Sequence, residues 1–464
     1  MTYLFIFVPF ILLVILNLLP KRLRAAAFYS TLAMLAAQVV FSPFEFVKPA
    51  QMEVIFGFNL IINNLSVILL MISGLIAGVS LVAGWATLKD DDKKFNFISL
   101  ILLSVIGLNG IAMVKDVFSL YVFIEATAVA TFILISLNMD KPAFEGILKY
   151  LILSVVASTL MLTSIALLII SCGSLGFSDI RAFIYPSGGT IFSQAAVALF
   201  ICGLLIKGGL VPFHGWVADA YTSAPASVSI LLAGIITKAS GVFTLIKFMT
   251  STLCFTTSIM DMLLFVGALS IVFGALAALG QKDIKRILAY SSISQMGYIV
   301  IALGTGTPLG IFAALFHFIN HAIFKSQLFV NAAAVEEQTG TRDMDKMGGL
   351  AQVMPVTGVT SAIASLSTAG IPPLAGFWSK LLIIISLWLS GNFAYAVIAV
   401  LASLLTLAYF LYFQRSIFFG KVPADLANVR EADALLVSPA VLLSALTVGI
   451  GLAFPFILKL FMRQ

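Results

Sequence analysis

Five ionisable residues interrupt long apolar stretches of this sequence: Glu125, Lys207, Lys238, Lys325 and Lys380. A charged side chain at the centre of a lipid-embedded helix costs about 2.5 kcal/mol or more, so such residues are rare in membrane segments. Those that occur mark ion pathways and proton relays. The chemistry predicted by these five residues is therefore the movement of ions through a membrane.

Two histidines lie close to one of the lysines. His317, His321 and Lys325 are spaced four residues apart, which places all three on one face of a helix. Imidazoles titrate near neutral pH and pass protons along such a face. We therefore favour a proton relay over ordinary packing, and also over a metal site, because no carboxylate or cysteine completes a ligand set.

Glycine and proline break two of the apolar stretches, one directly after Lys207 and one shortly before Lys380. Backbone groups freed at such breaks must be satisfied by protein or in a wet cavity, so broken spans often line a pathway. Because each break carries a lysine, we favour a pathway over two kinks without function. The breaking residues are Gly208, Gly209 and Pro212, then Gly370, Pro372 and Pro373; His214, which follows the first break, is a secondary candidate.

Composition sets the fold class that must position these residues. The chain is 61% hydrophobic and only 10% charged, and apolar runs of about twenty residues recur throughout. We predict an all-α polytopic membrane protein with about fourteen transmembrane helices. They lie near residues 3–19, 25–43, 63–87, 96–114, 117–137, 147–171, 191–211, 224–247, 259–280, 285–304, 308–334, 354–389, 393–417 and 434–460.

The spans are expected to form a single membrane domain over residues 1–464. The two breaks lie five spans apart, an odd number, so spans 4–8 and 9–13 would form two repeats of opposite orientation. Residues 1–95 then hold three peripheral spans, 96–248 and 259–417 hold the two inverted five-helix repeats, and 434–460 hold the final span.

The basic residues predict the orientation. Of the 26 Lys and Arg residues, sixteen follow odd-numbered spans, six lie on the other side and four are the lysines within spans. The positive-inside rule places the odd-numbered loops in the cytoplasm and both termini outside, which suits a multi-pass protein of the inner (cytoplasmic) membrane. Topology thus explains the net charge of +6, and no nucleic-acid partner is needed.

Neither a cofactor nor a metal is expected. Cys172, Cys202 and Cys254 are isolated, without the spacing of zinc, iron–sulfur or haem sites. Every predicted loop is short, which leaves no room for a nucleotide-binding or redox domain. The chain itself is therefore expected to be non-catalytic, driven by an ion gradient or by partner subunits.

Three blocks carry a family resemblance: Lys207 to Lys238, Asp283 to Tyr298, and His317 to Phe329. They resemble the antiporter-like subunits of respiratory complex I, of Mrp-type sodium/proton antiporters and of membrane-bound hydrogenases. The resemblance implies that Glu125 pairs with Lys207, and that Lys238, Lys325 with its histidines, and Lys380 continue a buried proton relay. It also implies that other membrane subunits are the partners.

Lys380 and the loop from Thr339 to Gly349 favour an Mrp D-like subunit within this family, with the complex I subunit as the alternative. Protons are favoured over sodium because Glu125 is the only carboxylate expected within the spans. Two further hypotheses stay open: a stand-alone transporter of organic solutes, and a scaffold in which Glu125 and Lys207 form a static pair.

Overall fold

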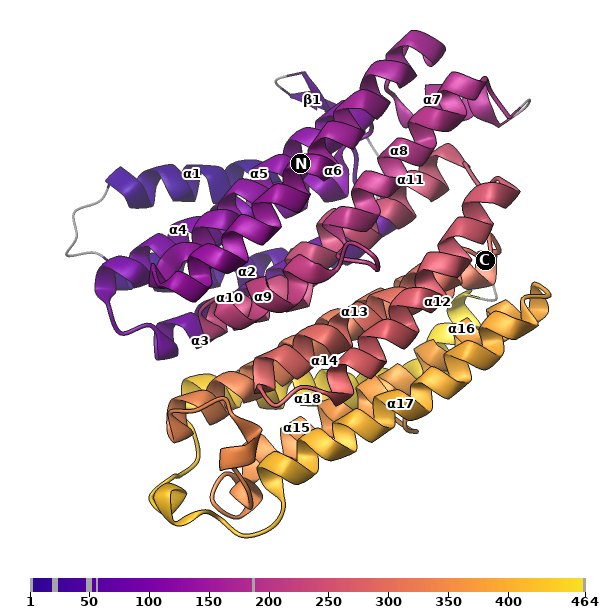
Figure 1. Ribbon diagram of the computed structural model, residues 1–464. Helices are drawn as coiled ribbons and strands as arrows, with labels where there is room; N and C mark the ends of the chain where they lie inside the picture. Colours follow the sequence, from indigo (N-terminus) through magenta and orange to yellow (C-terminus); the bar gives the residue numbers. More distant parts are fainter. Residues whose placement is uncertain (1–2, 19–23, 47–51, 56, 186–187, 462–464) are drawn as a thin grey trace. The chain divides into compact units, whose positions relative to one another are not determined.

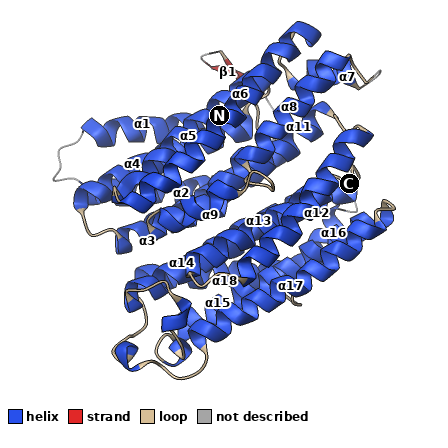
Figure 2. Cartoon of the chain, viewed as in Figure 1, coloured by secondary structure: helices blue, strands red, loops and turns tan. Residues whose placement is uncertain are grey.

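The computed structural model describes residues 3–18, 24–46, 52–55, 57–185 and 188–461. Its elements are almost all helices (Figures 1 and 2), joined by one short hairpin of β1 (Glu53–Ile55) and β2 (Phe58–Leu60), which the sequence did not predict. Eleven helices are long and apolar enough to cross a membrane. Lys21, Arg22, Lys48 and Arg463, which entered the charge count, lie outside the described residues.

Fourteen spans account for the long helices, as predicted. Twelve spans are continuous, although the eighth passes through two π-helical turns, and two spans are broken. The short helix α7 (Phe177–Ile184) lies between the sixth and seventh spans. The continuous spans are α1 (Leu4–Leu18), α2 (Arg24–Phe41), α3 (Asn64–Thr87), α4 (Asp91–Met113), α5 (Val117–Ile135), α6 (Lys141–Cys172), α10 to α11 (Ala226–Thr252), α12 (Thr257–Leu279), α13 (Ile284–Leu303), α14 (Pro308–Thr339), α17 (Phe393–Phe418) and α18 (Ala434–Phe461).

Each broken span consists of two helices in sequence. In the first, α8 (Ile191–Lys207) ends where Gly209 adopts a positive φ of 66°, and α9 (Gly215–Ser223) follows. In the second, α15 (Pro355–Ala369) ends at Gly370, with a φ of 89°, before α16 (Ala375–Leu389) begins. Glycine tolerates this left-handed backbone, and proline cannot continue the ladder of helical hydrogen bonds.

The freed backbone groups at both breaks find partners, as groups in a membrane must. The N–H of Gly209 donates to Ile206 O at 3.0 Å, and the indole Nε1 of Trp216 donates to the same carbonyl at 3.2 Å. At the second break, the N–H groups of Gly370 and Ile371 both donate to Leu366 O at 3.0 Å. The breaks are therefore capped helix ends.

The chain divides into two compact units. The first comprises residues 1–209 and 213–259, and the second comprises residues 210–212 and 260–464. In the first unit, the span from Ala226 to Thr252 is buried along its whole length. In the second, α14 packs against α13, α15, α16 and α18. The first predicted repeat falls within the first unit and the second within the second; their inverted relationship stays a prediction.

Several predicted loop residues lie instead on helices. α6 begins at Lys141 and α14 continues to Thr339, so the expected connector residues Glu336 and Glu337 are helical. Lys247 and Lys285, which were counted in loops, are both buried within spans. Their charges lower the local hydropathy and suggest a boundary, but the backbone remains helical because each ammonium group finds acceptors nearby.

Lys247 shows how such a charge is accommodated. Its Nζ donates to Ile111 O at 2.7 Å and to Ala112 O at 2.9 Å, at the C-terminal end of α4. Carbonyls at a helix C-terminus lack intrahelical partners and carry partial negative charge, which favours a cation. Lys285 instead lies 3.3 Å from Glu336 Oε2 of α14. Both lysines join neighbouring helices within one unit.

Candidate functional site

Glu125 and Lys207 form an ion pair within the first unit. Lys207, the last residue of α8, donates from Nζ to Oε1 of Glu125, on α5, at 2.8 Å. The side chain of Lys207 is 1% exposed and that of Glu125 is 28% exposed. A cation at a helix C-terminus is stabilised by the carbonyls there, and the break places Lys207 at such an end. The pairing expected from the resemblance is thus present in the structure.

Two serines of α6 flank this ion pair. The Nζ of Lys207 also donates to Ser154 Oγ at 2.6 Å, while Ser158 Oγ donates to Glu125 Oε1 at 2.6 Å. The serines lie one helical turn apart, so a single face of α6 contacts both charges. If the pair opens, Lys207 keeps one acceptor and Glu125 keeps one donor. The sequence analysis missed these serines, because hydroxyls are common in apolar spans.

Lys238 lies between two π-helical turns, η4 (Leu232–Ile236) and η5 (Ala239–Phe243). Its side chain is fully buried, and its Nζ has no hydrogen-bond partner within the part of the chain that the structure describes. The ring of Tyr221 lies nearby, with its centre 5.9 Å from Nζ. π-helical turns are rare and often occur at functional sites, which suits a relay position.

Glycines join the break to the helix that carries Lys238. A Cβ atom at Gly241 would lie 2.3 Å from the Cα of Gly208, so only glycine permits this approach of the two backbones. Gly208 directly follows Lys207, and Gly241 lies three residues after Lys238. The contact therefore fixes the segments that carry the two lysines against each other.

Lys325 occupies the centre of the second unit, on α14, and is fully buried. Its Nζ donates to the hydroxyl of Ser291 and, at 3.4 Å, to Leu288 O, both on α13. The ring of Phe410 lies 5.5 Å from the same atom. The ammonium group is thus held by neutral oxygens and an aromatic face.

The two histidines precede Lys325 on the same helix, as the spacing predicts. The rings of His317 and His321 lie 6.1 Å apart, with an interplanar angle of 22°. The Nδ1 of His317 is 2.9 Å from the hydroxyl of Ser379, the residue before Lys380. α14 therefore presents one line of titratable groups that reaches α16.

Lys380 lies on α16, beyond the second break, and is buried. Its Nζ lies 4.5 Å from the centre of the Tyr298 ring and 3.5 Å from Ala369 O, the last residue of α15. The Tyr298 ring also lies 5.9 Å from that of His317. Tyr298 thus touches both groups, a connection that the sequence analysis did not predict.

His214 lies apart from these groups. It is half-buried at the start of α9, without a side-chain cap to that helix. Within the described residues, no three His, Cys, Asp or Glu side chains are grouped for a metal ion. The site therefore consists of two polar clusters, one in each unit. The first holds Glu125, Lys207 and Lys238, and the second holds His317, His321, Lys325 and Lys380.

Comparison with known families now becomes informative. Residues 114–406, which contain every one of these groups, match the family described as NADH:quinone oxidoreductase/Mrp antiporter, transmembrane. The chain belongs to this family. It is a multi-pass membrane protein, as predicted.

Several relatives place this antiporter family member more closely. It is 33% identical over 403 residues to the D-type subunit of the Na(+)/H(+) antiporter of Alkalihalophilus pseudofirmus, covering 86% of this chain and 81% of the relative. It is 34% identical over 320 residues to the N-type subunit of the NADH-quinone oxidoreductase of Desulforudis audaxviator, covering 68% and 64%. Both branches suggested by the resemblance are thus represented.

Solved structures agree on the fold of this family member. A chain of the Mrp complex from Dietzia sp. DQ12-45-1b matches with a TM-score of 0.90 over 99% of this chain and 95% of that chain, at 24% identity. A chain of the membrane-bound sulfane sulfur reductase, an archaeal respiratory membrane complex, matches with a TM-score of 0.87 over 97% and 75%, at 29% identity. The all-helical membrane fold is confirmed.

Proposed function

We propose that this chain is a proton-translocating membrane subunit of a multisubunit complex, with the role of an Mrp D-like subunit. The observation that carries the proposal is the ion pair of Glu125 and Lys207 at the end of a broken helix. A static pair needs no second acceptor, yet Ser154 offers one to Lys207. The pair is therefore built to open without stranding its lysine.

The proposed relay uses the titratable groups of each unit in turn. In the first unit, opening of the pair changes the charge near Lys238, which responds by binding or releasing a proton. In the second unit, Lys325, His317, His321 and Lys380 are the proposed carriers. His214 stays a secondary candidate near the break. The proposed ion is the proton, with sodium exchanged for it in an antiporter.

Other membrane subunits are the proposed partners, since the structural relatives come from multisubunit membrane complexes. We place the chain in the inner (cytoplasmic) membrane, with both termini outside, on the asymmetry of its basic residues. Reporter fusions at the two termini test this orientation. A cytoplasmic signal at either terminus would contradict it.

The decisive experiment measures proton uptake by membrane vesicles that contain the assembled complex, with and without sodium. We expect Lys207→Ala and Glu125→Gln to abolish uptake, because each removes one member of the pair. Thr159→Ala is the matched control, because Thr159 is an exposed residue of α6 that bonds to its own helix backbone. Uptake that survives both pair variants would overturn the proposal and favour a scaffold.

A proton-pumping role in an NADH:quinone oxidoreductase is the second candidate, supported by the relative from Desulforudis audaxviator. Purification of the intact complex separates the two roles. Proton uptake that requires NADH and a quinone would favour the second candidate, whereas exchange driven by a sodium gradient would favour the antiporter. Robust solute uptake by the chain alone would contradict both and indicate a stand-alone transporter.

A further inference from the structure

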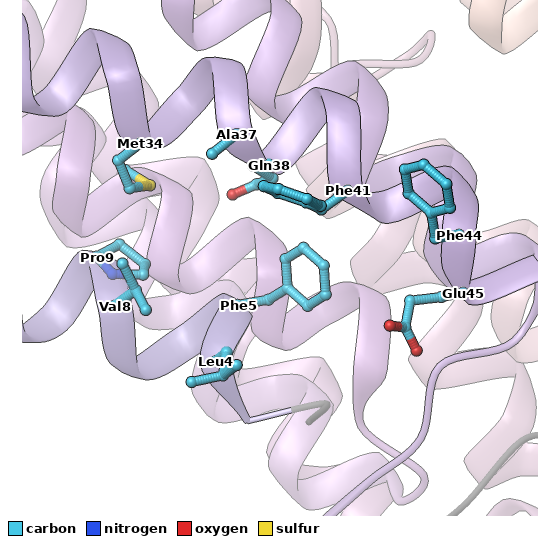
Figure 3. A pocket seen from close by; sticks show the side chains of 10 residues that line it. All are labelled: Leu4, Phe5, Val8, Pro9, Met34, Ala37, Gln38, Phe41, Phe44 and Glu45. Carbon is cyan, nitrogen blue, oxygen red and sulfur yellow. The ribbon is translucent and has the colours of Figure 1, made fainter. Parts of the chain in front are cut away.

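An apolar slot opens on the side of the first unit, remote in sequence from the proposed relay. It has a volume of about 400 Å³ and lies between α1 and α2, closed at one end by the short helix η2 (Ser42–Phe46). Its walls are almost entirely hydrocarbon. Figure 3 shows Met34, Val8 and Pro9 toward one end of the slot and Glu45 at the other.

The wall of this slot is held open by a buried amide network. Gln38, which lines the slot, is 5% exposed. Its Nε2 donates to Leu70 O at 2.9 Å and to Ser73 Oγ at 3.0 Å, and its Oε1 accepts from Asn109 Nδ2 at 2.9 Å. Both ends of the Gln38 amide are thus engaged by α3 and α4. The slot is a preformed feature and not a gap that α2 can close.

Asn109 also fixes the opposite wall. Pro9 has no N–H, so the carbonyl of Phe5 loses its helical partner on α1. The Nδ2 of Asn109 donates to this carbonyl at 2.7 Å. Both walls are therefore tied to α4, and the separation of α1 from α2 along the slot is set by one side chain.

Among the described residues that line the slot, the one charged side chain lies where a membrane span ends. α2 ends at Phe41, and Glu45 follows on η2, whereas the hydrocarbon walls extend back along the span. The side chains of Phe41 and Phe44 at this end are 61% and 60% exposed, so the slot opens sideways at the same depth. An occupant that matches this pattern has an alkyl chain within the membrane and a cation at its boundary.

We propose that this slot binds one alkyl chain of a phospholipid whose headgroup carries a primary ammonium, with that ammonium paired to Glu45. A volume of 400 Å³ holds roughly a dozen methylene groups, taking each as about the size of a water molecule at ~30 Å³. A carboxylate accepts hydrogen bonds from an ammonium but not from a trimethylated amine, and it repels an anionic headgroup. The occupant is thus phosphatidylethanolamine and not phosphatidylcholine or phosphatidylglycerol.

Native mass spectrometry of the full chain in detergent tests the headgroup. The chain is titrated with phosphatidylethanolamine and phosphatidylcholine of identical acyl chains. We expect the first lipid to bind about three- to fivefold more tightly, the range of a partly exposed ion pair. Glu45→Gln should remove this preference and leave binding of the alkyl chain. Equal binding of both lipids to the unaltered chain, or an undiminished preference in Glu45→Gln, would overturn the proposal.

A second pair of variants tests the slot itself. Ala37→Trp fills the slot from α2, whereas Val40→Trp adds the same side chain to an exposed position of α2 that does not line it. We expect the first variant to lose the bound lipid and the second to keep it, with the same thermal unfolding midpoint in both. Retention of the lipid by Ala37→Trp would place the binding site elsewhere and overturn the proposal.

Discussion

The Nζ atom of Lys380 lies 4.5 Å from the centre of the Tyr298 ring, so the buried ammonium group faces an aromatic surface. The phenol hydroxyl points elsewhere, since it donates to Ala399 O at 2.8 Å and lies 3.0 Å from Ser403 Oγ. The ring and the hydroxyl of one residue therefore have separate roles. The ring faces Lys380 across α13 and α16, and the hydroxyl joins α13 to α17.

Substitution of Tyr298 separates these roles. Tyr298→Phe keeps the ring and should retain proton uptake by the complex, whereas Tyr298→Leu removes a cation–π contact of about 2 kcal/mol or more at a desolvated site. We expect Tyr298→Leu to lower the initial rate of proton uptake roughly tenfold. Equal rates in the two variants would show that the ring does not stabilise the charge on Lys380.

The ion pair of Glu125 and Lys207 predicts a stability effect that is distinct from transport. Glu125→Leu leaves the buried Lys207 without its carboxylate, and removal of one partner of a buried pair costs about 3–5 kcal/mol. Because Glu125 is 28% exposed, we expect the lower part of this range. The double variant Glu125→Leu with Lys207→Met should recover most of the stability, since well-packed apolar pairs replace buried ion pairs with little loss.

Thermal unfolding measures the stability of both variants, and vesicle assays measure their transport. Proton uptake should be absent in the double variant despite its recovered stability. Recovery of uptake together with stability would mean that the pair serves packing alone.

The serines of α6 predict a milder phenotype. Ser154→Ala removes the second acceptor of Lys207 and Ser158→Ala removes a donor to Glu125. Each lost hydrogen bond to a charged group corresponds to about 1.5–3 kcal/mol. We expect each variant to fold and to shift the pH at which proton uptake is half-maximal. Thr163→Ala, which changes an exposed residue of α6, should leave this pH unchanged. An unchanged profile in both serine variants would exclude a positioning role.

Gly241 predicts a steric effect. Gly241→Ala forces a Cβ atom to within 2.3 Å of the Cα of Gly208, so one of the two backbones must move. Overpacking of this kind costs about 1–3 kcal/mol, and we expect the thermal unfolding midpoint to fall accordingly. The control is Gly78→Ala on α3, where a Cβ meets no atom within 4 Å. A midpoint that falls equally in both variants would contradict the close approach.

Cys254 predicts a pH-dependent reactivity. It lies in the loop between α11 (Thr244–Thr252) and α12, and burial raises the pKa of its thiol to about 11. With Cys172 and Cys202 replaced by serine, Cys254 should react with a maleimide at pH 8 at least tenfold more slowly in the folded chain than in the unfolded chain. Equal rates would contradict its burial.

The same pKa fixes the sign of the stability change with pH. The unfolded thiol titrates near pH 8.5, below its value in the folded chain. The folded state therefore holds this proton more tightly, and stability falls as the pH rises from about 8.5 to about 11.

Comparison of prediction and structure shows what a single sequence contains. The spans, both breaks and the residues from Glu125 to Lys380 were predictable, because isolated charges, glycines and prolines stand out against hydrocarbon. Ser154 and Tyr298 were not, since serine and tyrosine occur in membrane helices for many reasons and their roles depend on a neighbouring helix. The π-helical turns around Lys238 were equally hidden, because no residue pattern specifies an added residue in a helical turn.

Pro9 has a consequence for the order in which the protein is made. The carbonyl that it frees on Phe5 is satisfied by Asn109, which the ribosome adds about one hundred residues later. A newly inserted first span therefore carries an unsatisfied backbone group until the fourth span arrives. During biosynthesis, α1 must wait in the insertion machinery or at the edge of the bilayer, and completion of α4 is the event that releases it.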